Sequence, residues 1–119
     1  MELITAEIRA RLLENGRSNA ERIADDGRTI DFEPVVKLFT PDAACTWLIA
    51  EIDPDDHDIA FGLCDLGMGC PELGSVSISE LSAVRGKLGL AVERDLWFRA
   101  DKTLSAYAAE AHRLGYIKA

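Results

Sequence analysis

Apolar and polar residues near the start of the chain alternate at helical spacing. Arg and Glu separate the apolar positions, which predicts an amphipathic helix over 2–15. We expect this helix to end at Gly16, because glycine readily adopts the left-handed conformation that follows a helix C-terminus. The polar stretch 17–33 is then predicted to be a loop, with one short helical turn at 20–24. The apolar positions are Leu3, Ile4, Ile8, Leu12 and Leu13.

Four short β-prone runs occupy the middle of the chain, and polar segments separate them. The first run stops at Pro41, because proline cannot continue a ladder of backbone hydrogen bonds. The second and third runs flank the polar segment 53–58, which predicts a β-hairpin. The second is the clearest strand, since it is rich in β-branched and aromatic residues. The predicted strands are 35–40, 45–52, 59–66 and 72–78.

The last third of the chain predicts two more helices around an extended or mixed segment at 90–98. Ser79 can cap a short helix that runs to Arg85. The C-terminal helix can be capped by Thr103 or Asp101, and Gly115 ends it; its apolar stripe is Leu104, Tyr107, Ala108, Ala111 and Leu114. This order predicts an α+β fold, in which the N- and C-terminal amphipathic helices pack against one face of a small antiparallel sheet of three to five strands.

Length and composition indicate one globular domain over 1–119, with 48% hydrophobic and 29% charged residues. Cys45, Cys64 and Cys70 form no C-x-x-C pair, which favours reduced thiols over a secreted disulfide scaffold. The first residues lack the apolar core of a signal peptide, and no apolar stretch is long enough to span a membrane. We therefore expect a cytoplasmic protein with no membrane partner.

The formal net charge of −8 is concentrated in the middle of the chain. No Lys or Arg lies between Lys37 and Arg85, so the block 38–84 carries −9 and the remaining residues sum to +1. These acids either solvate the turns and protect the sheet from aggregation, or form a surface that attracts a basic protein partner. Nucleic acid is not the expected partner, because phosphates are held mainly by Lys and Arg. The block contains Asp42, Glu51, Asp53, Asp55, Asp56, Asp58, Asp65, Glu72 and Glu80.

The acidic turn supplies the candidate binding residues Asp53, Asp55, Asp56 and Asp58. Trp47 joins them, because a regulatory domain that binds a small ligand is a third possible function and would need an enclosed apolar pocket near Trp47. Both Trp47 and Trp97 are also expected to anchor the core. The turn does not match a calcium-binding loop, because Asp58 and Cys64 occupy the positions that require Gly and Glu. The spacing of Cys64 and Cys70 is not typical of zinc sites. We therefore expect no metal and no cofactor.

Carboxylates on neighbouring strands provide an enzymatic alternative. Two carboxyl groups that face each other can act as general acid and base in a hydrolase of glycosidase or nuclease type. The candidate catalytic residues are Glu51, Glu72 and Glu80. The chain contains none of the motifs of serine hydrolases, zinc proteases or P-loop enzymes, so a non-enzymatic protein is the main interpretation.

Several motifs together resemble one bacterial family. They are Lys37-Leu-Phe-Thr-Pro-Asp42, Trp47 with Glu51, Phe61-Gly62, Glu72-Leu-Gly74, Glu80-Leu81 and Gly89-Leu-Ala-Val-Glu-Arg-Asp95. Over about residues 1–105 the chain is similar to the uncharacterised family known as domain of unknown function 2958, which occurs on plasmids and other mobile elements. The resemblance implies a small accessory protein and transfers no catalytic residue. We therefore expect an interaction protein that acts through its acidic sheet surface on a protein partner with a basic surface.

Overall fold

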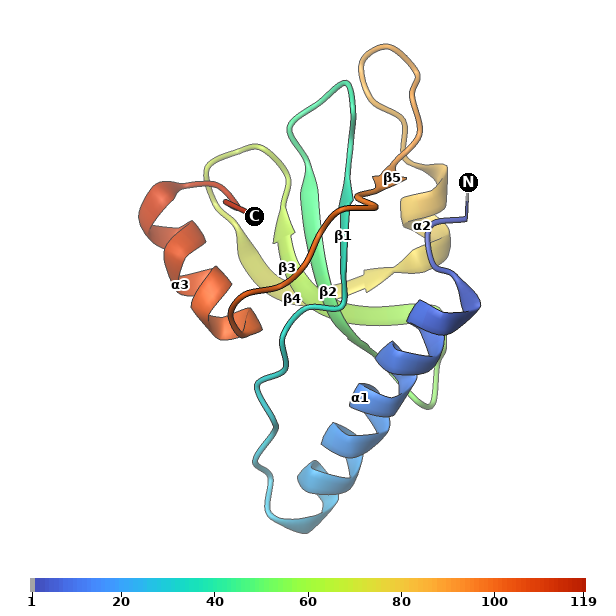
Figure 1. Cartoon of the computed structure of the whole chain (residues 1–119), viewed down its shortest axis with the longest axis vertical. Helices are drawn as coiled ribbons and strands as arrows, with labels where there is room; N and C mark the ends of the chain where they lie inside the picture. The colour runs from blue at the N-terminus through green and yellow to red at the C-terminus, as the bar shows by residue number, and fades with distance from the viewer. Residues whose placement is uncertain (1) are drawn as a thin grey trace.

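A five-stranded antiparallel sheet forms the centre of the molecule (Figure 1). This computed structural model describes residues 2–119, and its strands lie in the order β4-β3-β2-β1-β5. The predicted α+β fold and the predicted hairpin, here β2 with β3, are confirmed. The helices are α1 (Ala6–Asp25), α2 (Ile78–Ala83) and α3 (Leu104–Leu114), and the strands are β1 (Val36–Phe39), β2 (Thr46–Ile52), β3 (Ile59–Asp65), β4 (Glu72–Ser77) and β5 (Glu93–Arg94).

Helices cover both faces of the sheet, whereas we expected them on one. We call these the α1 face, which carries α1 and α2, and the α3 face, which carries α3. The central strand β2 explains the difference: Trp47 and Ile49 point into the core under α1, while Leu48 and Ala50 point into the core under α3. Successive side chains of a strand point to opposite faces, so a nearly continuous apolar run requires cover on both.

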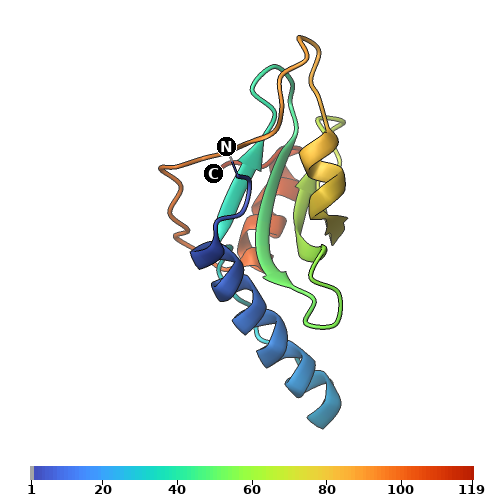
Figure 2. The same ribbon diagram turned by 90° about the vertical axis from the view of Figure 1, so that its right-hand side faces the viewer.

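The helix α1 continues past Gly16 to Asp25, so the prediction of a loop over 17–33 is wrong for its first half. Gly16 does not end the helix but brings it against β2: a Cβ atom on Gly16 would lie 1.8 Å from the carbonyl oxygen of Ile52. Beyond this contact α1 extends past the sheet (Figure 2). Within residues 2–119, neither α1 nor any other helix is long and apolar enough to cross a membrane.

Two other details differ from the expectation. The side chain of Ser77, not Ser79, caps α2 by accepting a hydrogen bond from the backbone N–H of Glu80 at 3.2 Å. Trp97 is 89% exposed, so it does not anchor the core; its neighbour Phe98 packs against the α3 face instead. The segment before α3 therefore presents Trp97 to solvent.

The C-terminal segment is held in place by a buried carboxylate at the end of β3. Asp65 Oδ2 accepts a hydrogen bond from the backbone N–H of Ile117 at 3.0 Å, and its Oδ1 accepts from Gly67 at 2.9 Å. Gly115 ends α3 in the left-handed conformation, with φ of 82°, as predicted. One member of the acidic block thus has a structural role.

Candidate binding groove

A groove lies on the α3 face of the sheet where α3 no longer covers it. Its floor is formed by Phe61 and Leu73, which are large apolar side chains left exposed on β3 and β4. Its wall is the part of α1 that extends past the sheet, where Ile23 is also exposed. Two cavities of about 520 and 380 Å³ make up the groove, and both are lined by Asn19, Ile23, Glu51 and Phe61. The floor and the wall are therefore mainly apolar, with Glu51 between them.

A β-bulge directs Glu51 into this groove. Strict alternation along β2 would place residue 51 on the α1 face, together with Trp47 and Ile49. The pairing register shifts between Ile49 and Glu51, so that Glu51 lies opposite Phe61, on the α3 face. Ile52 then points into the core of the α1 face, where it is fully buried. The extra residue in the strand thus buries an isoleucine and brings a carboxylate to the groove floor.

Asn19 on α1 holds the carboxylate of Glu51 in position. Its Nδ2 donates to Glu51 Oε2 at 2.6 Å and to the carbonyl oxygen of Ile30 at 3.2 Å. Its Oδ1 accepts from the backbone N–H of Ile30 at 2.7 Å. Asn19 is only 3% exposed, so these bonds satisfy a buried amide and also attach the connection after α1 to the helix.

Glu51 is a half-buried carboxylate without a cationic partner in the part of the chain that the structure describes. Burial raises the pKa of Glu51 above its ordinary value, and the hydrogen bond from Asn19 opposes this effect. Among residues 2–119, no Lys, Arg or His lies within ion-pair distance of it. Oε1 accepts no hydrogen bond from this part of the chain, so it is free to accept one from a ligand. A partly desolvated, uncompensated carboxylate favours the approach of a cation.

The acidic turn between β2 and β3 divides into two roles. Asp53 and Asp55 line the groove beside Glu51, and Asp53 Oδ1 accepts from the backbone N–H of Asp55 at 2.8 Å. Asp56 shapes the turn, because its Oδ1 accepts from the backbone N–H of Asp58 at 3.1 Å. The structure therefore brings two of the four candidate aspartates into the groove.

Asp58 connects this turn to the start of α2. Its carboxylate accepts from Ser77 Oγ at 2.5 Å, from the backbone N–H of Ser79 at 2.8 Å and from Ser79 Oγ at 2.9 Å. These hydrogen bonds, with Ser77 first, hold the pKa of Asp58 below its ordinary value. Asp58 is thus occupied by contacts within the chain.

Trp47 lies in the core of the α1 face and is 3% exposed. It lines none of the cavities described here, so its side chain is not available to a partner or a small ligand. The assignment of Trp47 to the binding residues is corrected accordingly. Its size and apolarity are used in packing β2 against α1.

The three candidate catalytic carboxylates do not share a cleft. Glu51 lies on the α3 face, whereas Glu72 pairs with Cys64, whose side chain packs on the α1 face. Glu80 is exposed on α2. The paired geometry that acid–base hydrolysis requires is therefore absent from this set. No three His, Cys, Asp or Glu side chains of residues 2–119 are grouped so that they could hold a metal ion.

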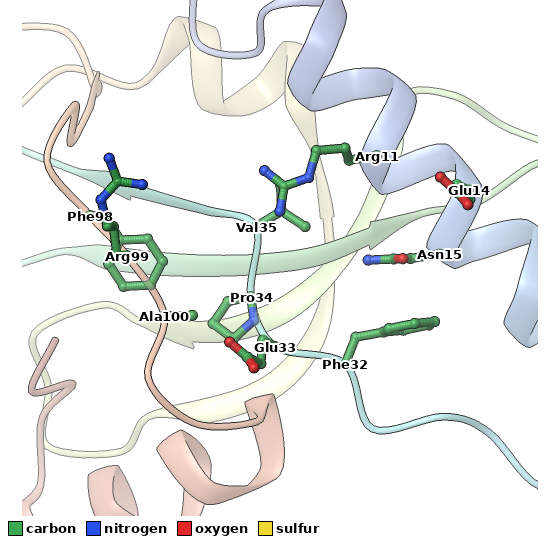
Figure 3. Close-up of a pocket in the computed structure, with 10 residues that line it drawn as sticks. All are labelled: Arg11, Glu14, Asn15, Phe32, Glu33, Pro34, Val35, Phe98, Arg99 and Ala100. Carbon is green, nitrogen blue, oxygen red and sulfur yellow. The ribbon is translucent and has the colours of Figure 1, made fainter.

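A separate cavity of about 700 Å³ lies between α1 and the segment that leads to α3 (Figure 3). Arg11 and Glu14 reach it from α1, Arg99 from the opposite side, and Glu33 from the connection between them. Two positive and two negative side chains line this cavity, so it has no net charge to select a ligand. The groove around Glu51, in contrast, has a charge of one sign.

A protein-family model with the description "Protein of unknown function (DUF2958)" matches residues 3–118. The chain belongs to this family. The match confirms the resemblance found in the sequence and extends it through α3. No curated protein and no solved structure matched the chain in the same comparisons.

In this DUF2958 protein, sequence reasoning missed most of the groove. Asn19 and Ile23 fall in the stretch predicted to be a loop, although their spacing of four residues would have placed them together on a helix. Phe61 and Leu73 lie on correctly predicted strands, and the structure leaves both side chains exposed. Glu51 was a candidate, but as a catalytic residue.

Proposed function

We propose that this DUF2958 protein is a non-enzymatic interaction protein whose groove binds a positively charged segment of a partner protein. The observation that carries the proposal is the half-buried carboxylate of Glu51, which has no cationic partner among residues 2–119 and lies among exposed apolar side chains. A carboxylate that is both desolvated and unpaired is costly in the free protein, and a ligand cation relieves this cost.

The groove is suited to a long basic side chain. The methylene groups of Lys or Arg can lie on Phe61, Leu73 and Ile23 while the charged end reaches Glu51. A cation close to the ring of Phe61 gains a further attraction to its π face. Apolar contact and charge pairing therefore act on the same side chain of the partner.

The surrounding acids support the same partner. Asp53 and Asp55 line the groove, and the block 38–84 carries −9. A field of one sign accelerates the encounter with an oppositely charged protein, and salt weakens this effect. Bulk DNA or RNA would be repelled by the same field.

The proposal includes a cytoplasmic location and an accessory role on a mobile element. The three cysteines are free thiols, which is the state favoured in a reducing compartment. The mobile-element origin follows only from the family resemblance. The hydrolase alternative receives no support, because Glu72 and Glu80 lie away from Glu51.

The direct test is an NMR titration of the wild type and of Glu51→Gln with a flexible basic peptide, Gly-Arg-Gly-Arg-Gly. We expect the peptide to shift the resonances of Phe61 and Leu73. We expect Glu51→Gln to weaken binding about 30-fold, which is equivalent to about 2 kcal/mol. This is the low end of the loss for a desolvated charge pair, and we choose it because Glu51 is only half buried. Binding should strengthen as the pH rises through the raised pKa of Glu51, because the cation pairs with the ionised form.

Glu72→Gln is the matched control, since it removes the same charge from an exposed position on the other face. It should change the affinity by no more than about twofold. The proposal is refuted if Glu51→Gln and Glu72→Gln weaken binding equally, or if the acidic peptide Gly-Glu-Gly-Glu-Gly binds as well as the basic one.

A further inference from the structure

One border of the groove is an open edge of the sheet. The strand β4 is the last strand on its side of the sheet, and within residues 2–119 it pairs only with β3. Protein sheets commonly protect such edges with Lys, Pro or a bulge. Residues 72–77 contain no Lys, Arg or Pro, and their register with β3 is regular throughout. The side chains of Leu73 and Ser75, in the middle of this strand, are exposed.

The pairing pattern shows which backbone groups face outward. The carbonyl oxygen of Ile59 accepts from Asp53 at 2.9 Å and so points toward β2, whereas the carbonyl oxygen of Asp58 accepts from Ile78 at 2.8 Å and points toward β4. Because backbone groups alternate in direction along a strand, Ala60, Gly62 and Cys64 also point toward β4.

The partners of those residues on β4 are Val76, Gly74 and Glu72, which therefore use their N–H and C=O groups within the sheet. Leu73 and Ser75 lie between them, so their N–H and C=O groups point away from β3, into the open edge. The N–H groups of Leu73 and Ser75 donate to no acceptor in residues 2–119. Both side chains lie on the α3 face, at the groove.

Three groove residues form a row across the strands. Glu51 pairs with Phe61, and Phe61 pairs with Ser75, so the three lie side by side on the same face. A strand added beyond β4 would place one residue next in this row, opposite Ser75. Its backbone would be three strand spacings from β2, about 14 Å, which the extended side chains of an arginine and of Glu51 can span together.

We propose that the partner segment binds in an extended conformation as a sixth strand along β4, with an arginine opposite Ser75. The N–H and C=O groups of Leu73 and Ser75 bond to the added strand, and the arginine side chain crosses Ser75 and Phe61 to pair with Oε1 of Glu51. The guanidinium stacks on the ring of Phe61 and offers several donors. Lysine is shorter and has no planar group, so it is the weaker choice. This inference rests on the proposed function and specifies how its ligand binds.

The test uses the full chain and the peptide acetyl-Thr-Val-Arg-Val-Thr-amide, with amide hydrogen exchange followed by NMR. Saturating peptide should slow exchange at Leu73 and Ser75 about tenfold or more, because both N–H groups gain an acceptor. Exchange at Gly74 and Val76 is the internal control and should stay unchanged, since these N–H groups are already bonded to β3. Replacing the arginine of the peptide with lysine should weaken binding about threefold to tenfold.

A variant tests the same edge from the protein side. Ser75→Pro removes an outward N–H without removing a bond to β3, so it should fold and bind the peptide about tenfold more weakly. Its far-UV circular dichroism and urea midpoint show whether it folds. If it does not fold, the exchange measurement on the wild type decides alone.

The outcomes separate this inference from the proposed function. Binding of the peptide with no slowing at Leu73 and Ser75 overturns strand addition and leaves the groove proposal intact. Equal binding of a helical peptide of the same charge also overturns strand addition. If exchange slows at both amides but Glu51→Gln binds the peptide as well as the wild type, strand addition is supported and Glu51 is not the recognition group. Absence of binding by every basic peptide would refute both.

Discussion

Substituting Gly16 with alanine should destabilise the protein, although alanine is the better helix former. Gly16 is buried in the middle of α1, where alanine would by itself stabilise the helix by about 1 kcal/mol. The added Cβ, however, would lie 1.8 Å from the carbonyl oxygen of Ile52 and 2.9 Å from its carbon. Both are backbone atoms of the central strand, so no change of rotamer can relieve the contact.

The magnitude follows from the movement that the clash requires. Ordinary contact begins near 3.4 Å, so α1 and β2 must separate locally by about 1.6 Å. Leu12, which is fully buried one turn earlier, would lose part of its packing in that movement. Overpacking of this kind costs about 1–3 kcal/mol, occasionally more, and a clash with backbone falls in the upper part of that range. We therefore expect a net loss of about 1–2 kcal/mol after the helix propensity is counted.

Urea unfolding of the two proteins is the appropriate assay. With a slope of about 1–2 kcal/mol per molar urea for a chain of this size, the midpoint should fall by about 1 M. Gly74→Ala is the matched control: its Cβ meets nothing within 4 Å and its φ is not positive, so its midpoint should stay within about 0.5 M of the wild type. The reasoning is refuted if Gly16→Ala is as stable as the wild type or more stable, since α1 would then not approach β2 as closely as described.

Two further predictions concern the pH dependence of stability. Glu51→Gln should be more stable than the wild type at neutral pH, because burial raises the pKa of Glu51 and its ionised form is disfavoured in the folded state. Thermal unfolding measured across pH should show this advantage growing with rising pH and vanishing below about pH 4. An advantage that does not change with pH would contradict the prediction. Asp58→Asn should be less stable than the wild type at neutral pH, because the lowered pKa of Asp58 means that its ionised carboxylate stabilises the fold. The same measurement should show this difference in stability shrinking as the pH falls below the ordinary pKa of an aspartate. Equal stability at neutral pH would refute the role of Asp58 in holding α2.

The strands and the C-terminal helix could be predicted because their patterns reflect burial directly. The run from Trp47 to Ala50 is apolar on consecutive positions because β2 is covered on both faces. The stripe that begins at Leu104 has the helical period because only one side of α3 meets the sheet. Where local pattern and tertiary contact agree, the sequence is sufficient.

The second half of α1 could not be predicted in this way. The stretch 17–25 contacts the core so little that it shows no apolar stripe, and the glycine before it resembled a helix end. Gly16 is required because α1 approaches the strand β2 closely at this position, a contact that appears only when the chain has folded. Trp97 shows the converse case, since its apolarity predicted burial and the path of its segment leaves it exposed.

The chain's acidic block and its separation from the basic residues are properties of the sequence, and from them we predicted a basic partner. Which acids act together was decided by the tertiary structure. A one-residue bulge turned Glu51 to the α3 face, Asn19 reached it from a helix more than thirty residues earlier, and Asp58 was committed to α2. Charge is carried by each residue alone, whereas desolvation and pairing depend on neighbours that only the fold brings together.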